Sequence, residues 1–388
     1  MIPYGRQDIT EDDLAAVRDV LTSDFLTQGP RVPEFEAAVA TAAGAAHGVA
    51  ANSATSALHI ACMALDLGPG DWLWTVPNTF VASANVGIYC GAQVDFVDID
   101  PNSFNMCPAA LATKLAEAEI AGRLPKVLIP VHLTGQSADM ERIGALAKRY
   151  GVRVIEDASH AIGASFGGQP IGTCTHSDIT VFSFHPVKIV TTAEGGVAVT
   201  QDAELAGRMR RAASHGITRD PALMTHESDG PWYYQQIELG YNYRMTELQA
   251  ALGVSQMQRL QAYVARRAEH ARAYDAALAD LPLDLPWQDP RSRSAWHLYV
   301  IRLRLDEIGL SHRAVFEALR TAGLGVNLHY IPVHSQPFYR QFGFSEGDFP
   351  NAETYYARAI SIPLFATMTN AQRDQVVKIL HTTLKQSR

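Results

Sequence analysis

Short apolar runs of strand length alternate along the chain with stretches in which apolar residues recur at helical spacing. Six runs of the first kind, several of them rich in β-branched residues, are Trp72–Val76, Val94–Val97, Val127–Val131, Val152–Ile155, Ile179–Phe184 and Val197–Thr200. Helical stretches such as Ser56–Leu67 and Met140–Tyr150 separate some of these runs. The alternation predicts an α/β fold with a mainly parallel sheet and helices on both faces.

The residues before this region predict two helices. Thr10 and Asp13 have the spacing of a capping box, and apolar residues follow them at helical intervals. The alanine-rich segment Pro33–Ala46 predicts a second helix. Farther along, the polar stretch Thr218–Gln236 contains a glycine next to a proline, and we expect it to form a mobile loop.

The alternation of strand-length and helical segments ends at about residue 240. One long helical stretch opens at Thr246 and runs to about Asp280, where Pro282 ends it. A strand is expected over His297–Leu303, and Ser311 caps a further helix. We therefore expect a large α/β domain over residues 1–245, which includes the N-terminal helix, and a smaller α+β domain over residues 246–388.

Composition and charge exclude several classes of protein. Apolar residues make up 47% of the 388 residues, enough to bury a large core, so the chain is not mainly disordered. Its 32 basic and 40 acidic side chains leave a net charge of −8, which argues against a nucleic-acid coat or a polybasic membrane anchor. Neither a secretory signal nor an apolar run of about 18 residues is visible, so we expect a cytoplasmic protein. Four cysteines without a CxxC pair predict no metal site and no redox dithiol: Cys62, Cys90, Cys107 and Cys174.

The first place with candidate chemistry is the turn Asn52–Ala57, between an apolar strand and a helix. Small hydroxyl residues at the N-terminus of a helix leave backbone N–H groups free, and the helix dipole favours an anion there. A phosphate would fit this turn, although an ordinary N-cap explains the same residues. Neither GxxxxGK[ST] nor GxGxxG stands here, so nucleotide-binding motifs lack support.

Two further places follow later strands. The pair Glu156 and Asp157 comes at the end of an apolar strand, where Asp157 could face a cationic partner in a cleft, or the two could be a solvated capping pair. Lys188 stands between Val187 and Ile189, and burial of its amine would lower the pKa and make it a nucleophile. The alternative is a lysine whose amine reaches solvent from an apolar loop.

Together these three places match the needs of one cofactor. Pyridoxal phosphate requires an amine for its aldehyde, an acid for its ring nitrogen and hydrogen-bond donors for its phosphate. Lys188, Asp157 and the Ser53–Ser56 turn supply one of each. The sequence therefore predicts a pyridoxal-phosphate enzyme whose nucleophile is an amine.

Specific segments of the chain resemble a known family, the sugar-nucleotide aminotransferases of the DegT/StrS type. The resemblance rests on NSATSALHIA, PNTFVASAN, VIEDASHAIGA, FSFHPVK, TTAEGG and GYNYRMTELQAALG. These enzymes have the type I fold of pyridoxal-phosphate enzymes, with a mainly parallel seven-stranded sheet and a smaller C-terminal domain. The resemblance also implies a homodimer with active sites at the subunit interface.

The resemblance assigns roles to individual residues. Lys188 is implied as the lysine that binds the cofactor and Asp157 as the partner of the ring nitrogen. The other implied cofactor contacts are Ala54 and Thr55 at the phosphate turn, Phe80 stacked on the ring, His160 near its hydroxyl, Ser183 at the phosphate, and Asn242 at the phosphate of the neighbouring subunit. Candidates for contacting the sugar nucleotide are His215, Arg244, His329 and Tyr330, with Arg219 as a further cation for the diphosphate. Packing or loop structure would explain the two histidines and Tyr330 equally well.

Within the family, ALHIACMALDLGPGD, GAQVDFVDID and LHYIPVHSQPFY are most similar to the branch of pseudaminic acid biosynthesis. That similarity implies transfer of an amino group from L-glutamate to C4 of a UDP-linked 4-keto-6-deoxy-N-acetyl-hexosamine. One departure is Ile189–Val190, where the branch has a proline and a β-branched residue. Two alternatives stay open: amination at C3 or of a dTDP- or GDP-sugar, and a regulatory protein that binds the cofactor without turnover.

Overall fold

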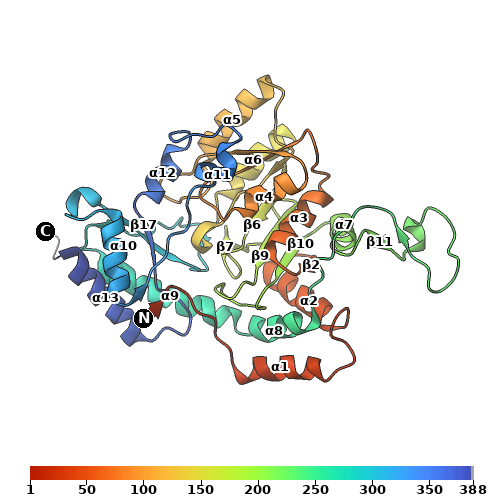
Figure 1. Cartoon of the computed structure of the whole chain (residues 1–388), viewed down its shortest axis with the longest axis horizontal. Helices are drawn as coiled ribbons and strands as arrows, with labels where there is room; N and C mark the ends of the chain where they lie inside the picture. The colour runs from red at the N-terminus through yellow and green to blue at the C-terminus, as the bar shows by residue number, and fades with distance from the viewer. Residues whose placement is uncertain (386–388) are drawn as a thin grey trace.

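The computed structural model describes residues 1–385 and centres on a sheet of seven strands (Figure 1). In spatial order the strands are β2 (His47–Ala51), β10 (Gly196–Thr200), β9 (Ile179–Ser183), β6 (Arg153–Asp157), β5 (Val127–Leu128), β3 (Trp72–Thr75) and β4 (Gln93–Phe96). Strand β10 is antiparallel to both of its neighbours, whereas the pairs from β9 to β4 are parallel. The predicted α/β fold with a mainly parallel sheet is confirmed.

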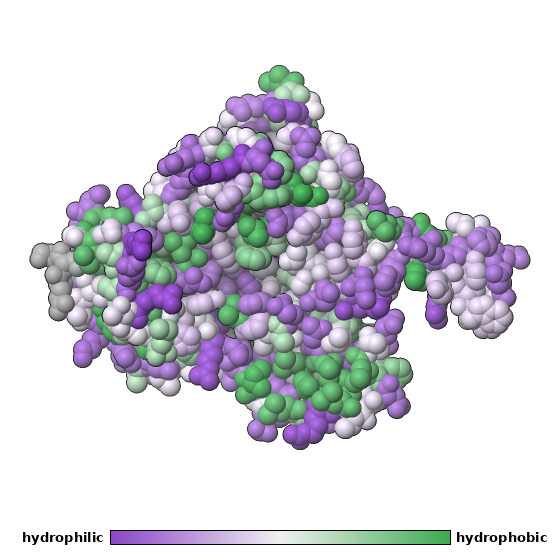
Figure 2. Space-filling view, in the orientation of Figure 1, coloured by the Kyte–Doolittle hydropathy of each residue, from purple (hydrophilic) through white to green (hydrophobic). Residues whose placement is uncertain are grey.

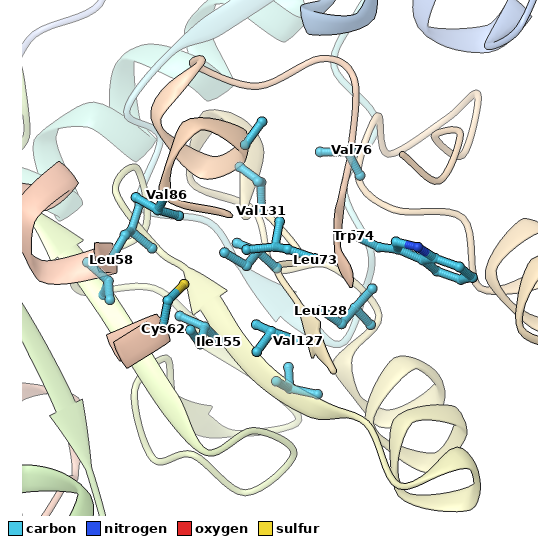
Figure 3. Packing of buried hydrophobic residues seen from close by; sticks show 14 of the residues in the cluster. Leu58, Cys62, Leu73, Trp74, Val76, Val86, Val127, Leu128, Val131 and Ile155 are labelled. Carbon is cyan, nitrogen blue, oxygen red and sulfur yellow. The ribbon is translucent and has the colours of Figure 1, made fainter. Parts of the chain in front are cut away.

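Helices cover both faces of this sheet. The helices of this part of the chain are α1 (Glu11–Leu21), α2 (Arg31–Ala43), α3 (Ala54–Ala64), α4 (Ala82–Tyr89), α5 (Pro108–Ile120), α6 (Met140–Tyr150) and α7 (Ala203–Ala213). Alternate residues of β10 face opposite ways, as the twofold period of a strand requires. Val197 joins the cluster that contains Phe35 of α2, and Ala198 joins the cluster that contains Leu58 of α3. Figure 3 shows Leu58 and Cys62 of α3 packed against Ile155 and the neighbouring strands.

The C-terminal part contains the remaining helices and a smaller sheet. Its helices are α8 (Glu247–Met257), α9 (Leu260–Leu278), α10 (His312–Thr321), α11 (Pro337–Arg340), α12 (Pro350–Tyr356) and α13 (Asn370–Lys385). The smaller sheet has the order β13 (Leu283–Asp284), β15 (Tyr299–Leu303) and β17 (Ala359–Ile362). A further three-stranded sheet joins β14 (Ser292–Arg293) to β7 (Ser165–Phe166) and β8 (Gln169–Pro170).

Several predicted helix boundaries agree with the structure, and one prediction is wrong. Thr10 caps α1 with the expected capping box, and Ser311 caps α10. The stretch after Thr246 forms two helices rather than one, because the chain turns at Gln258 and Arg259. The turn lets Arg259 reach the buried carboxylate of Asp13 at 2.7 Å, a long-range contact that helical periodicity does not reveal.

The first residues of the chain pack with its C-terminal part. Strand β1 (Ile2–Pro3) pairs in parallel with β16 (Leu324–Gly325), and Ile2 lies in the apolar cluster of the small sheet. The division into domains of residues 1–245 and 246–388 stays a prediction. Ile2 and Pro3 belong to the first range but pair with β16 in the second. Tyr4, the residue that follows β1, lines the cavity described below.

Two apolar surfaces stand out on the exterior. Residues 217–236, here called the arm, project from the body between β11 (Ile217–Thr218) and β12 (Gln235–Gln236) (Figure 1). The arm exposes Trp232 to 72%. A second surface, the apolar patch, lies over α1 in the lower part of Figure 2 and consists of Leu14, Leu21, Phe25 and Leu26. The predicted mobility of the arm stays a prediction.

Candidate active site

A cavity of about 590 Å³ opens where β6 and β9 end, at the edge of the sheet at which parallel strands collect ligands. Nine of the predicted site residues line it: Ala54, Thr55, Phe80, Asp157, His160, Ser183, Lys188, His329 and Tyr330. The cavity therefore brings together residues that lie up to 326 positions apart in the sequence, from Tyr4 to Tyr330.

Lys188 lies on the loop that follows β9. Its backbone N–H donates to the carbonyl of His185 at 2.9 Å, and the next residues, Ile189 and Val190, are buried. The lysine itself is partly buried at the cavity wall. Burial lowers the pKa of its amine to about 8, against the opposing influence of the Asp157 carboxylate. As the apolar neighbours in the sequence indicated, burial makes this amine lose its proton more readily than an ordinary lysine does.

Asp157 and Glu156 lie side by side in sequence but on opposite faces of β6, as strand geometry requires. Asp157 faces the cavity and is 5% exposed. The hydroxyl of Ser83 donates to its Oδ2 at 2.6 Å, and the backbone N–H of Ser159 donates to its Oδ1 at 3.1 Å. These contacts hold a carboxylate at a fixed place beside the cavity.

Glu156 has a structural role on the other face. Its Oε2 lies 2.6 Å from Nε2 of the buried His132, and hydroxyls of Ser177 and Thr180 donate to its Oε1. Burial alone would raise the pKa of this carboxyl, but the hydrogen bond from His132 and the hydroxyls outweigh burial and keep it below its usual value. The predicted alternative of a solvated capping pair is wrong for both carboxylates, because both are buried.

The turn before α3 has the form of an anion site. Ser53 is the N-cap, and its hydroxyl accepts the backbone N–H of Ser56 at 3.1 Å. Ala54 and Thr55, whose N–H groups belong to the first turn of the helix, line the cavity. The backbone of β10 passes so close that a Cβ on Gly196 would lie 2.5 Å from the Cα of Ala54. The structure thus confirms Ser53 as an N-cap, and a phosphate at this turn stays a prediction.

The opposite wall of the cavity comes from the C-terminal part and is called the C-terminal wall below. It consists of His297, Asn327, Leu328, His329 and Tyr330. The rings of Tyr330 and Phe80 lie 6.1 Å apart, and Phe80 is 58% exposed. Phe80 therefore presents a free aromatic face between the two walls, as required of a ring that stacks on a planar group.

The remaining predicted residues do not line the cavity of this chain. Asn242 pairs with Ser214, His215 donates its backbone N–H to Tyr241, and Arg244 donates to the hydroxyl of Ser214 at 3.1 Å. They form a strip beside the end of α7. Arg219 lies on the arm, over the ring of Tyr234. The role of Asn242 was predicted for a neighbouring subunit and stays a prediction.

Several residues in or beside the cavity were not predicted from the sequence. Ser83 carries a signal that could have been used, because it is a polar residue inside an apolar helix. His297 lies just before β15 of the small sheet rather than at the carboxyl end of a strand, so the rule that located the other site residues does not find it. Tyr4 has no local signal, because only the pairing of β1 with β16 brings it to the cavity.

The arrangement fits pyridoxal phosphate. Lys188 offers an amine, Asp157 a fixed carboxylate, the turn at Ser53 free N–H groups, and Phe80 an aromatic face. Within residues 1–385 no three His, Cys, Asp or Glu side chains are placed to hold a metal ion. A sheet of this type with this set of groups defines the class of pyridoxal-phosphate-dependent aminotransferases.

The comparisons with known proteins agree with the geometry. The chain belongs to the DegT/DnrJ/EryC1/StrS aminotransferase family, whose model matches residues 7–381. It is 39% identical to the spore coat polysaccharide biosynthesis protein SpsC of Bacillus subtilis, over 99% of this chain and 97% of the relative. Its structure is similar to that of Helicobacter pylori PseC, an aminotransferase of pseudaminic acid biosynthesis, with a TM-score of 0.90 and 29% identity over 99% of both chains.

A third relative bears on the cofactor. The putative sugar aminotransferase Spr1654 of Streptococcus pneumoniae, solved in its PMP form, matches over 100% of both chains with a TM-score of 0.90 and 28% identity. The same protein has also been solved in its PLP form. The cofactor of the present enzyme is pyridoxal phosphate. Across the described part of the chain, no helix is long and apolar enough to cross a membrane.

Proposed function

We propose that this aminotransferase moves the amino group of L-glutamate to C4 of a UDP-linked 4-keto-6-deoxy-N-acetyl-hexosamine. The product would be UDP-4-amino-4,6-dideoxy-N-acetyl-β-L-altrosamine, an intermediate of pseudaminic acid biosynthesis. The observation that carries the proposal is that Lys188 and the C-terminal wall line the same cavity. The amine proposed to perform the transfer shares this cavity with His329 and Tyr330, which belong to the segment most similar to that branch of the family.

Lys188 acts as the general base and acid of the transfer. When bound, the cofactor supplies an aldehyde for amines and a ring that accepts electrons. With a pKa of about 8, about one Lys188 amine in ten is neutral at pH 7, against about one in three thousand for an ordinary lysine. The neutral amine would remove the proton from the α-carbon of the amino donor and deliver it to the carbon that carries the aldehyde of the cofactor. The Asp157 carboxylate, held beside the cavity by Ser83 and the backbone of Ser159, would stabilise positive charge on the ring nitrogen.

Tyr330 presents a hydroxyl proton to the substrate. The backbone N–H of Thr134 donates to Nδ1 of His160 at 3.3 Å, so the proton of the neutral ring is on Nε2. That Nε2–H donates to the hydroxyl oxygen of Tyr330 at 3.1 Å. The Tyr330 hydroxyl is then free to donate a hydrogen bond to a substrate oxygen. Burial raises the pKa of Tyr330, so the hydroxyl keeps its proton.

A second copy of the chain completes the site in this proposal. Of the described residues that line the cavity, Lys188 is the one Lys or Arg, and a diphosphate needs further cations. Arg219, Arg244 and Asn242 lie outside this cavity, and the arm and the apolar patch expose large apolar side chains. These features support a homodimer in which Asn242 and the two arginines act on the partner's cofactor and substrate.

Two variants test the shared site. Lys188→Ala removes the amine, and Asn242→Asp places a negative charge at the predicted phosphate contact. Each variant alone should be inactive. If Asn242 acts across the interface, mixed dimers of the two variants contain one intact site and regain up to about a quarter of the wild-type activity after subunit exchange. A mixture that stays inactive, from dimers shown to exchange subunits, contradicts the shared site.

A panel of keto-sugar nucleotides tests the substrate. The enzyme, with glutamate as donor, is offered UDP-, dTDP- and GDP-linked sugars with a keto group at C3 or C4, and the product is located by NMR. An amine at C4 of the UDP-linked sugar supports the proposal. Amination at C3 or of another nucleotide sugar supports the first alternative. Cofactor binding without conversion by any amino donor would identify a regulatory protein instead.

A further inference from the structure

His297 is a histidine of the C-terminal wall without an assigned role. It lies just before β15, is 3% exposed, and lines the cavity. Its ring lies 4.4 Å from that of His160, centre to centre. Three imidazoles thus line the cavity that contains Lys188: His297 and His329 of the C-terminal wall, and His160 after β6.

Two of these imidazoles have used their hydrogen-bonding capacity within the protein. His160 accepts from Thr134 and donates to Tyr330. In His329 the amide of Asn327 faces Nε2 at 3.4 Å, so Nε2 accepts and Nδ1–H donates to the hydroxyl of Ser361 at 2.8 Å. Because a neutral imidazole has one donor and one acceptor, neither ring has a nitrogen left for a ligand.

His297 differs from both neighbours. As far as residues 1–385 extend, neither of its ring nitrogens has a hydrogen-bond partner, and Nδ1 is completely buried. Nε2 is the nitrogen that stays accessible, and the residue lines the cavity. Buried polar groups without a partner are uncommon and call for an explanation. A ligand in the cavity would supply a partner for the accessible Nε2, while the buried Nδ1 keeps none.

The backbone around His297 is held firmly. The buried guanidinium of Arg267 donates from Nη1 to the carbonyls of His297 and Leu364, at 3.1 and 2.9 Å. On the other side, Gly135 approaches so closely that a Cβ would lie 3.1 Å from the backbone nitrogen of His297, and its φ of 105° also favours glycine. The ring is therefore presented from a fixed backbone, which suits recognition.

The residues that fit the cofactor and the residues left for the substrate lie on different walls of the cavity. The groups that fit the cofactor lie on the large sheet and its helices: Lys188, Asp157, Phe80, Ser183 and the turn at Ser53. His297 lies on the C-terminal wall with His329 and Tyr330. We propose that His297 binds substrate: Nε2–H donates to the carboxylate of the amino donor in one half-reaction and to an oxygen of the acceptor in the other. This inference rests on the proposed function.

The charge state of His297 explains why one residue can serve both substrates. Burial, followed by the neighbouring His160 and Lys188, holds the pKa of His297 well below its usual value, so the ring is neutral at pH 7. A neutral N–H donor binds a carboxylate without requiring a negative charge. The same N–H therefore also donates to a sugar hydroxyl or keto oxygen, which are uncharged groups that a fixed positive charge would not favour.

Two substitutions test the role. His297→Phe keeps a ring of similar size and removes the donor, while His297→Gln keeps an amide N–H near the position of Nε2. We measure cofactor affinity, the visible absorption of the bound cofactor, and the rate of the amino-donor half-reaction at increasing glutamate. His297→Phe should lower kcat/KM of that half-reaction about tenfold to a hundredfold and leave cofactor affinity and absorption unchanged. His297→Gln should recover most of the loss.

Controls separate the possible failures. His47→Phe, at the opposite end of the sheet on β2, should leave the half-reaction unchanged. Unchanged kinetics in His297→Phe, or a loss of cofactor affinity equal to the loss of rate, would overturn the substrate role.

If His297→Phe does not fold, His297→Asn, whose amide is too short to reach, replaces it. The glutamate half-reaction needs no sugar, so a wrong sugar assignment would appear in the wild-type panel and leave this result interpretable. If glutamate does not react with the wild type, the half-reaction is followed with the amino acid that does.

Discussion

Ser83 on α4 donates its hydroxyl proton to Oδ2 of Asp157 at the end of β6, across 2.6 Å. Phe80 lies just before the start of the same helix, so one short segment carries both the ring at the cavity and the hydroxyl that fixes the carboxylate. Thr79 in turn lies 2.9 Å from the Ser83 hydroxyl and completes a buried chain of polar groups. The position of the charge at Asp157 therefore depends on α4 as much as on its own strand.

This dependence predicts graded effects of two substitutions. Ser83→Ala removes one hydrogen bond to a charged group and should weaken cofactor binding about tenfold to a hundredfold. Asp157→Ala removes the charge itself and should weaken binding and catalysis far more. Titration of the cofactor-free protein with pyridoxal phosphate measures both. Equal affinities for Ser83→Ala and the wild type would mean that the hydroxyl does not position the carboxylate, and normal rates in Asp157→Ala would remove that residue from its role.

Replacement of Lys188 tests the central assignment. Lys188→Ala lacks the amine proposed to join the cofactor and move the proton, so the absorption band of the cofactor bonded to the lysine should disappear. Turnover should fall by at least about a hundredfold to ten-thousandfold, the usual contribution of a general base. Absorption spectra and product formation are the measurements. A variant that keeps full turnover would show that another group performs the transfer.

The pKa of Lys188 predicts a pH dependence of cofactor capture. The neutral amine is the nucleophile, and its pKa is about 8. The rate at which the cofactor-free protein takes up pyridoxal phosphate should rise with pH and level off above about 8. N-acetyl-lysine in solution provides the comparison, because its rate should continue to rise toward pH 10. A protein profile that follows the free amine would show that burial does not act on Lys188.

Two glycines give a matched test of the anion site. A methyl group at Gly196 would lie 2.5 Å from the backbone of Ala54, so Gly196→Ala should displace the turn, weaken cofactor binding and destabilise the protein by about 1–3 kcal/mol. Gly207 on α7 has its nearest neighbour at 3.7 Å, the tip of Arg211. Gly207→Ala should be neutral or stabilise by up to about 1 kcal/mol. Thermal unfolding and cofactor titration compare the two, and equal behaviour would contradict the close approach.

The three buried imidazoles predict acid sensitivity. Burial lowers the pKa of His329 to about 3 and holds those of His160 and His297 well below normal. The unfolded chain takes up these protons near pH 6.5 while the folded protein does not, so stability falls as pH drops below about 6.5. Each imidazole contributes a slope of up to about 1.4 kcal/mol per pH unit. Urea unfolding of the cofactor-free protein between pH 7 and 5 should give a shallower slope for His297→Gln; an identical slope would mean that His297 is protonated in the folded state.

The sequence was informative wherever the chemistry depends on neighbours in the chain. Lys188 is recognisable because Val187 and Ile189 flank it, and Asp157 because it ends an apolar strand. The sheet and most helices follow from periodicity for the same reason. The break at Arg259 and the roles of Ser83 and His297 depend on contacts with residues that are far away in the sequence. Local patterns contain no information about such partners.

The pairing of β1 with β16 has a consequence for how the protein is made. Ile2 must wait for Leu324, which the ribosome adds about 320 residues later, and at roughly 5–20 residues per second this takes tens of seconds. During that time the large sheet can form, but Tyr4 has no place to dock. The cavity therefore becomes complete late in synthesis, and the nascent chain has the cavity residues of the large sheet long before it has the C-terminal wall.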